Sequence, residues 1–213
     1  MDFASLLHIV EDEPVFETGF LLSGDVDPFD VRKQLSRWTT TRKLFQLRRG
    51  LYTLAPPYQK SIPHPFLIAN RLVANSYISL QSALAYYGMI PESVVITTSV
   101  ATARPIKYDT PLGQFDFRHL QTDWFVGYRR VDLGNSQFAF IAGPEKALLD
   151  LVYLQPGGDN LDYLSSLRLQ ALDQLDLNLL EQLASAAKKP KFTRAIKIIQ
   201  QLSVEESGSY QRL

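Results

Sequence analysis

Four prolines close together divide this chain more firmly than any other feature of its sequence. They lie in the segment "APPYQKSIPHP", at positions 56, 57, 63 and 65. Proline lacks a backbone N–H and disfavours helix, so this segment is expected to be a semi-rigid connector between two domains. The predicted boundaries are an N-terminal domain over residues 1–57, the connector over 58–65, a second domain over 66–205 and a frayed tail over 206–213.

Charge is segregated within the first 60 residues. Residues 1–30 carry eight acids and no lysine or arginine, whereas residues 31–60 carry eight bases and no acid. The whole chain has 22 basic and 22 acidic residues, so its overall balance predicts no polyanionic partner. The local asymmetry, however, indicates a unit with one basic side. The alternative is charge matching, in which the acids of one helix pair with the bases of the next.

A basic helix is predicted after residue 27. Asp27 suits the N-cap position and Pro28 the first helical position. Val31, Leu35 and Trp38 follow at helical spacing and form one apolar stripe. At about 100° per residue, the opposite face carries the polar residues Arg32, Lys33, Ser36, Arg37 and Thr40. Phe29 also falls on that polar face, and the sequence pattern assigns it no role.

A β-hairpin is predicted in "RKLFQLRRGLYTLAPP", residues 42–57. The flanking runs alternate roughly at period two, and Arg49-Gly50 supplies a two-residue turn, which places Arg48 and Arg49 at the tip of the hairpin. Two helices are expected upstream, at residues 3–11 and roughly 15–22, with "LSGDV" as the break before the basic helix. This order is typical of a winged helix-turn-helix, in which the third helix enters the major groove and the hairpin reaches phosphates or the minor groove. The predicted DNA-contacting residues are Arg32, Lys33, Ser36, Arg37, Thr40, Arg42, Lys43, Arg48 and Arg49.

The second domain is expected to mix helices and strands, which gives an α+β fold class overall. "SLQSALAYYG" predicts a helix capped by Ser79 and stopped by Gly88. "SVVITTSV", "GQFDFRHL", "DWFVGY" and "SQFAFIA" predict strands. "GPEKALLDLVYL" predicts an apolar helix beginning at Pro144, followed by two or three closing helices.

No catalytic constellation is predicted in this domain, nor any metal or cofactor site. Glu145 and Lys146 are expected to be structural. The chain contains no cysteine, which excludes disulfides and thiol chemistry. No stretch resembles a signal peptide or a membrane span, so a soluble cytoplasmic protein is expected. A second basic run has two interpretations. It is either a contact surface for nucleic acid or a protein partner, or an ordinary solvated helix. Its residues are Lys188, Lys189, Lys191, Arg194 and Lys197.

Four blocks of the sequence together resemble the AbiEi-type antitoxins, which are also described as predicted transcriptional regulators of viral defence systems. These blocks are "VRKQLSRW…KLFQLRRGLYTLAPP", "PHPFLIANRL…SYISLQSALAYYGMIPE", "TPLGQFDFRHL" and "PEKALLDLVYLQPGG". The resemblance covers residues 14–200. It implies an N-terminal winged helix-turn-helix that represses its own operon through inverted repeats. It also implies a C-terminal antitoxin domain that antagonises a nucleotidyltransferase-like toxin encoded beside it. One departure is Arg42, where relatives are expected to carry a glycine that ends the recognition helix.

The predicted function is therefore that of a DNA-binding autorepressor and antitoxin of a bacterial toxin-antitoxin, phage-defence system, without enzymatic activity. Its expected partners are a double-stranded DNA operator, the cognate toxin and a second copy of the chain on DNA, with no membrane. Whether the toxin is bound directly stays open. One alternative is a stand-alone winged-helix regulator whose second domain senses a small molecule. Another is an enzyme of nucleotide chemistry with an accessory DNA-binding domain.

Overall fold

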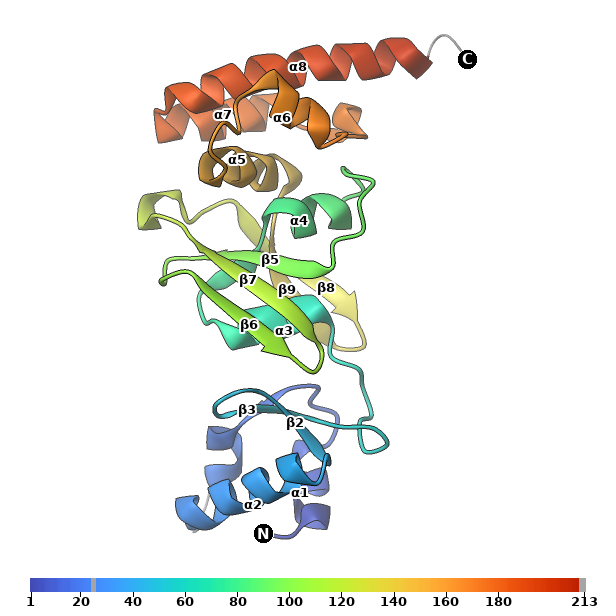
Figure 1. Cartoon of the computed structure of the whole chain (residues 1–213), viewed down its shortest axis with the longest axis vertical. Helices are drawn as coiled ribbons and strands as arrows, with labels where there is room; N and C mark the ends of the chain where they lie inside the picture. Colours follow the sequence, from blue (N-terminus) through green and yellow to red (C-terminus); the bar gives the residue numbers. More distant parts are fainter. Residues whose placement is uncertain (24–25, 211–213) are drawn as a thin grey trace.

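The chain forms two units built around two hydrophobic clusters, as seen in a computed structural model that describes residues 1–23 and 26–210 (Figure 1). We call residues 1–58 the N-terminal unit and residues 65–210 the second unit. Together they give a mixed α+β fold. The N-terminus and the long last helix lie at opposite ends of the molecule. Among the described residues, no helix combines the length and the apolar character needed to cross a membrane.

The N-terminal unit packs two α-helices and a 3₁₀ helix against a small sheet. Its strands pair antiparallel in the order β1-β3-β2. In chain order the elements are α1 (Phe3–Val10), β1 (Phe16–Glu17), η1 (Thr18–Leu22), α2 (Pro28–Thr40), β2 (Leu44–Arg48) and β3 (Leu51–Leu54). Val31, Leu35 and Trp38 of α2 are all buried in the core of this unit, which confirms the predicted apolar stripe.

The helix expected over residues 15–22 is wrong in part. Phe16 and Glu17 form strand β1, which pairs with Tyr52 and Leu51, and only Thr18–Leu22 coil into a 3₁₀ helix. The reason is tertiary, since Phe16 is buried and its backbone completes the edge of the sheet. The predicted break at "LSGDV" includes residues 24 and 25, which lie outside the described residues.

The second unit is built on a six-stranded mixed sheet in the order β6-β7-β5-β4-β9-β8. β4 pairs parallel with β9 and β5 parallel with β7, while the remaining neighbours are antiparallel. The strands are β4 (Ser76–Ile78), β5 (Ile96–Ala101), β6 (Ile106–Thr110), β7 (Gly113–His119), β8 (Tyr128–Gly134) and β9 (Gln137–Ala142). The strand predicted in "DWFVGY" is mostly absent, because Thr122–Trp124 forms the 3₁₀ helix η2 and β8 begins only at Tyr128.

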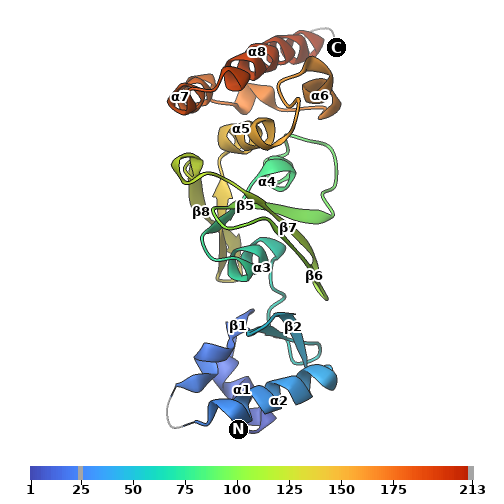
Figure 2. The same cartoon turned by 60° about the vertical axis from the view of Figure 1, so that its left-hand side comes forward.

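Helices cover both faces of this sheet. α3 (Pro65–Leu72) lies on the side that faces the N-terminal unit, and α4 (Leu80–Tyr86) and α5 (Pro144–Leu154) lie on the other (Figures 1 and 2). α6 (Leu161–Ser166), the 3₁₀ helix η3 (Leu172–Gln174), α7 (Leu177–Ala187) and α8 (Pro190–Tyr210) stack beyond α5. Because α8 continues to Tyr210, residues 206–210 are helical and not frayed as predicted; residues 211–213 lie outside the described residues.

The proline-rich connector is fastened to the second unit. The amide of Gln137 in β9 accepts from the backbone N–H of His64 (2.7 Å) and donates to the carbonyl oxygen of Ile62 (2.9 Å). Three apolar side chains of the N-terminal unit, those of Val15, Leu47 and Leu51, are buried in the hydrophobic cluster of the second unit. The two units therefore share a packed junction.

Candidate nucleic-acid interface

Helix α2 begins as its sequence predicts. The Asp27 carboxylate accepts a hydrogen bond from the backbone N–H of Phe29 (2.8 Å), and Pro28 occupies the first helical position. The buried stripe fixes the rotation of the helix about its axis. Its other face is consequently held toward solvent at the end of the molecule farthest from α8 (Figures 1 and 2).

The exposed face of α2 contains all five residues predicted to contact DNA from this helix. These exposed residues are Arg32, Lys33, Ser36, Arg37 and Thr40. None of the three bases forms an ion pair with another described residue. Among the described residues, charge matching is therefore not found on α2, whereas Arg48 pairs with Glu17 (3.7 Å) within the unit and Lys60 of the connector pairs with Asp12 (3.3 Å).

The C-terminus of α2 ends in a Schellman motif. The N–H of Lys43 bonds to the carbonyl oxygen of Trp38 (2.9 Å), and the N–H of Arg42 bonds to that of Thr39 (3.1 Å). Arg42 therefore adopts the left-handed conformation, with φ of 55°, at the position where glycine is preferred. Its side chain is exposed. The Lys43 ammonium instead lies over the Phe3 ring, 4.5 Å from the centroid, and so contributes to the fold of the unit.

The hairpin of β2 and β3 forms where predicted, with Arg49 and Gly50 in the turn. Gly50 has φ of 83°, which favours glycine at this position. The turn is held against the start of η1, because the Thr18 N–H donates to the Gly50 carbonyl oxygen (2.9 Å). Arg49 is exposed.

Arg48 does not project from the tip as predicted. Its Nε donates to the carbonyl oxygen of Leu72 (3.0 Å), and Nη2 donates to that of Arg71 (3.3 Å). These carbonyls belong to the C-terminal turn of α3, where a helix attracts positive charge. A register shift between Gln46 and Arg48 interrupts the alternation from which the tip position was inferred. Arg48 thus fastens the hairpin to the second unit, which corrects its expected role.

The second basic run is mostly engaged within the second unit. Arg194 Nε donates to Asp159 Oδ2 (2.7 Å), and Lys191 donates to the Gln155 carbonyl oxygen in the same loop. Lys189 lies over the Tyr153 ring, 5.0 Å from its centroid. Of the five predicted residues, the two others, Lys188 and Lys197, are exposed. The structure does not bring the five together as one free cationic surface.

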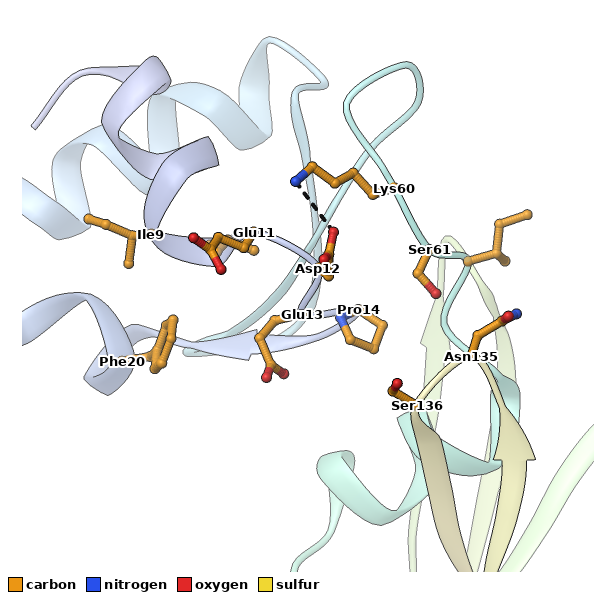
Figure 3. A pocket seen from close by; sticks show the side chains of 12 residues that line it. Ile9, Glu11, Asp12, Glu13, Pro14, Phe20, Lys60, Ser61, Asn135 and Ser136 are labelled. Atoms are coloured by element: carbon orange, nitrogen blue, oxygen red, sulfur yellow. Dashed lines mark ion pairs between the residues drawn. The ribbon is translucent and has the colours of Figure 1, made fainter.

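A groove with three acidic residues and Lys60 in its lining opens between the C-terminal end of α1 and the β8–β9 turn (Figure 3). Glu11, Asp12 and Glu13 line it together with the apolar side chains Ile9 and Phe20. Its charge is opposite to that of the exposed α2 face. The predicted polarity of the N-terminal unit is therefore present in the fold, with bases on α2 and acids after α1.

A buried polar cluster in the core of the second unit was not predicted from the sequence. Lys146 and Asp150, one helical turn apart on α5, form an ion pair whose side chains are 1% and 0% exposed. Asp150 also accepts from the hydroxyls of Tyr77 (3.0 Å) and Ser79 (2.8 Å), and the Lys146 ammonium lies 4.1 Å from the Trp124 ring centroid. The i, i+4 spacing in an apolar helix could have revealed the pair.

Burial governs the titration of this cluster. Desolvation lowers the pKa of the Lys146 ammonium and raises the pKa of the Asp150 carboxyl, while the attraction between them opposes both shifts. Burial and the nearby Asp150 charge raise the pKa of Tyr77. Because both side chains of the ion pair are buried, we expect the cluster to affect the stability of the fold. The predicted structural role of its neighbour Glu145 agrees with a hydrogen bond from the Asp176 N–H to Glu145 (2.9 Å).

No protein-family model matches this chain, and a comparison with curated proteins also returns no match.

Proposed function

We propose that this protein is a DNA-binding transcriptional repressor whose N-terminal unit is a winged helix-turn-helix. The observation that carries the proposal is the exposed face of α2, where Arg32, Lys33 and Arg37 have no ion-pair partner among the described residues. The element order of the unit also supports it, since α1, η1 and α2 precede a hairpin. In this proposal α2 is the recognition helix.

The proposed contacts divide into base readout and phosphate binding. Arg37, in the third turn of α2, is central enough to reach a base edge, with Lys33 and Ser36 beside it. Arg42 and Arg49 are exposed on loops next to the helix and suit the phosphate backbone, which sets register without reading sequence. Lys43 and Arg48 are left out of the interface because their side chains are engaged within the chain.

The resemblance to AbiEi-type antitoxins extends the proposal to the second unit. In the proposal drawn from this resemblance, the protein represses its own operon through inverted repeats, with two copies of the chain on the DNA. The second unit counteracts a nucleotidyltransferase-like toxin. This part of the proposal rests on the four sequence blocks. It is tested by co-expressing the chain with the toxin-like gene beside its own: growth rescue supports it, and continued arrest contradicts it.

The DNA-binding part is tested by selecting bound duplexes from a random pool with the full chain. Arg37→Ala is expected to weaken binding to the selected duplex by about 1–3 kcal/mol. Arg104→Ala, at an exposed arginine in the loop after β5, is the matched control and should leave binding unchanged. If no sequence is enriched, or if both variants bind like the wild type, α2 is not the interface.

One observation favours the ligand-sensing alternative. An aromatic pocket lies beside the junction and is lined by Phe125, Tyr128, Phe138 and Phe140 together with Arg71. Arg71 in turn donates to the Val15 carbonyl oxygen of the N-terminal unit (3.2 Å). A ligand that moved Arg71 would therefore act on the contact between the units. Phe140→Ala tests this reading, because it should abolish any metabolite-dependent change in DNA affinity and leave ligand-free affinity intact.

A further inference from the structure

One aromatic side chain on the basic face of α2, that of Phe29, is largely exposed. The Phe29 residue is 71% exposed. Its backbone N–H donates to the Asp27 carboxylate at the start of the helix, and this bond does not depend on the side chain. A phenylalanine normally contributes to stability by burial, and this one forgoes most of that gain. Packing against the described residues therefore does not account for a phenylalanine at this position.

The position of Phe29 on the helix is well defined. Lys33, Ser36 and Thr40 follow it at i+4, i+7 and i+11, so the four side chains form one line along the middle of the exposed face. Phe29 is the N-terminal member of that line. In helix-turn-helix proteins the N-terminal residues of the recognition helix contact base edges.

The chemistry of these four aligned side chains, and of the bases beside them, indicates which kind of partner binds this face. The face presents an apolar ring beside positively charged side chains that form no ion pair with other described residues. Such a surface fits a partner that carries both negative charge and an apolar group. The major groove of DNA offers this combination, since phosphates flank it and the 5-methyl group of thymine projects into it. A second copy of the same face fits poorly, because Arg32, Lys33 and Arg37 would meet their own like charges.

We infer that Phe29 is a specificity-determining residue that packs on the 5-methyl group of a thymine in the major groove. This inference rests on the proposed DNA-binding function and goes further by naming one base and one atom group. Phe29 thereby adds an apolar sequence preference to a face whose other members bind through hydrogen bonds and charge. The preference falls at the N-terminal end of α2, next to the positions read by Lys33.

The test removes single methyl groups from DNA. Each thymine of a duplex selected by the full chain is replaced in turn by deoxyuridine, which lacks the methyl group and keeps the base-pairing edge. For each bound copy, we expect one thymine at which the deoxyuridine replacement weakens wild-type binding about fourfold relative to the unmodified duplex. This is the effect expected when one methyl group is lost from an apolar contact. Phe29→Ala should lose at least as much affinity for the thymine duplex and show no further loss on the uracil duplex.

Two further variants sharpen the result. Phe29→Leu should keep part of the methyl sensitivity, since it retains an apolar side chain. Phe20→Ala is the matched control, because Phe20 is also an exposed phenylalanine (49%) but lines the groove next to the β8–β9 turn, and it should keep full methyl sensitivity. The Phe29 variants should melt like the wild type, because this side chain is largely exposed, whereas Phe20→Ala, which truncates a half-buried side chain, needs only to remain folded at the temperature of the assay.

The possible outcomes separate the two proposals. If the wild type selects no sequence, the proposed DNA-binding function fails. If it selects a sequence but no uracil substitution matters, or Phe29→Ala stays as methyl-sensitive as the wild type, the inference about Phe29 is overturned and DNA binding stands. Loss of binding to phosphatidylserine vesicles on Phe29→Ala, with DNA binding unchanged, would also overturn it and assign the face to a lipid surface.

Discussion

Replacing Lys146 by methionine tests the buried ion pair of α5 most directly. Methionine keeps most of the side-chain volume and removes the charge. Asp150 would then be left fully buried with only the Tyr77 and Ser79 hydroxyls as donors. Removing one partner of a buried pair leaves an uncompensated charge, so we expect the free energy of unfolding to fall by about 3–5 kcal/mol at neutral pH.

The pH dependence of this loss has a definite sign. Burial raises the pKa of Asp150 in the folded state, and without Lys146 that shift grows. A raised folded pKa gives stability that is complete below the unfolded pKa and is lost as pH rises toward the folded pKa. Lys146→Met should therefore lose stability with rising pH, at up to about 1.4 kcal/mol per pH unit.

Asp150→Asn should show the opposite slope. It leaves Lys146 buried without its carboxylate, and burial lowers the pKa of that ammonium. Between the lowered folded pKa and the unfolded pKa, the unfolded chain binds one more proton than the folded chain. Stability then rises with pH. The wild-type pair holds one proton whether it is charged or neutral, so its contribution should be nearly flat around neutral pH.

Urea denaturation from pH 5 to pH 8 measures all three profiles. The chain has two tryptophans, and a Trp38→Phe background leaves Trp124, which contacts Lys146, as the fluorescence reporter for the second unit. A loss below about 1 kcal/mol for Lys146→Met would refute the reasoning, because it would mean that water reaches the carboxylate. Slopes of the same sign for the two single variants would refute it as well.

Three further predictions concern the N-terminal unit. Arg42→Gly should raise the free energy of unfolding by about 1 kcal/mol, since it relieves a left-handed arginine, and a thermal melt checks this. Arg49→Ala should flatten the plot of log DNA affinity against log salt by about one unit, whereas Arg48→Ala should leave that slope unchanged and lower stability by about 1–2 kcal/mol. A fragment of residues 1–60 should unfold at a lower urea concentration than the N-terminal unit of the full chain, because it exposes apolar side chains of the junction.

Local signals made much of the N-terminal unit predictable. Asp27 and Pro28 mark the start of α2, the apolar spacing fixes its buried face, and Gly50 marks the hairpin turn. Each of these signals acts within a few residues of its effect. The misreading of residues 15–22 is different, because β1 forms by pairing with β3, more than thirty residues later in the chain.

The partners of buried and half-buried charges could not be read from the sequence. Arg48 bonds to carbonyl oxygens at positions 71 and 72, and Asp150 accepts from Tyr77 and Ser79 on a distant part of the chain. Residue type gives the capacity for such contacts, whereas only the fold decides which donor meets which acceptor. Arginines are for this reason poor guides to an interface until their neighbours are known.

The junction determines how the proposed recognition helix is presented. Arg48 crosses from the hairpin to the end of α3, and Arg71 crosses back from α3 to the carbonyl oxygen of Val15. Leu47 and Leu51 on the same hairpin are buried in the second unit's cluster, while Leu44 and Leu54 are buried with α2. The hairpin is thus packed on α2 through some of its side chains and on the second unit through others. A displacement of α3 must therefore move the hairpin or break these contacts. In both cases the packing between the hairpin and α2 changes.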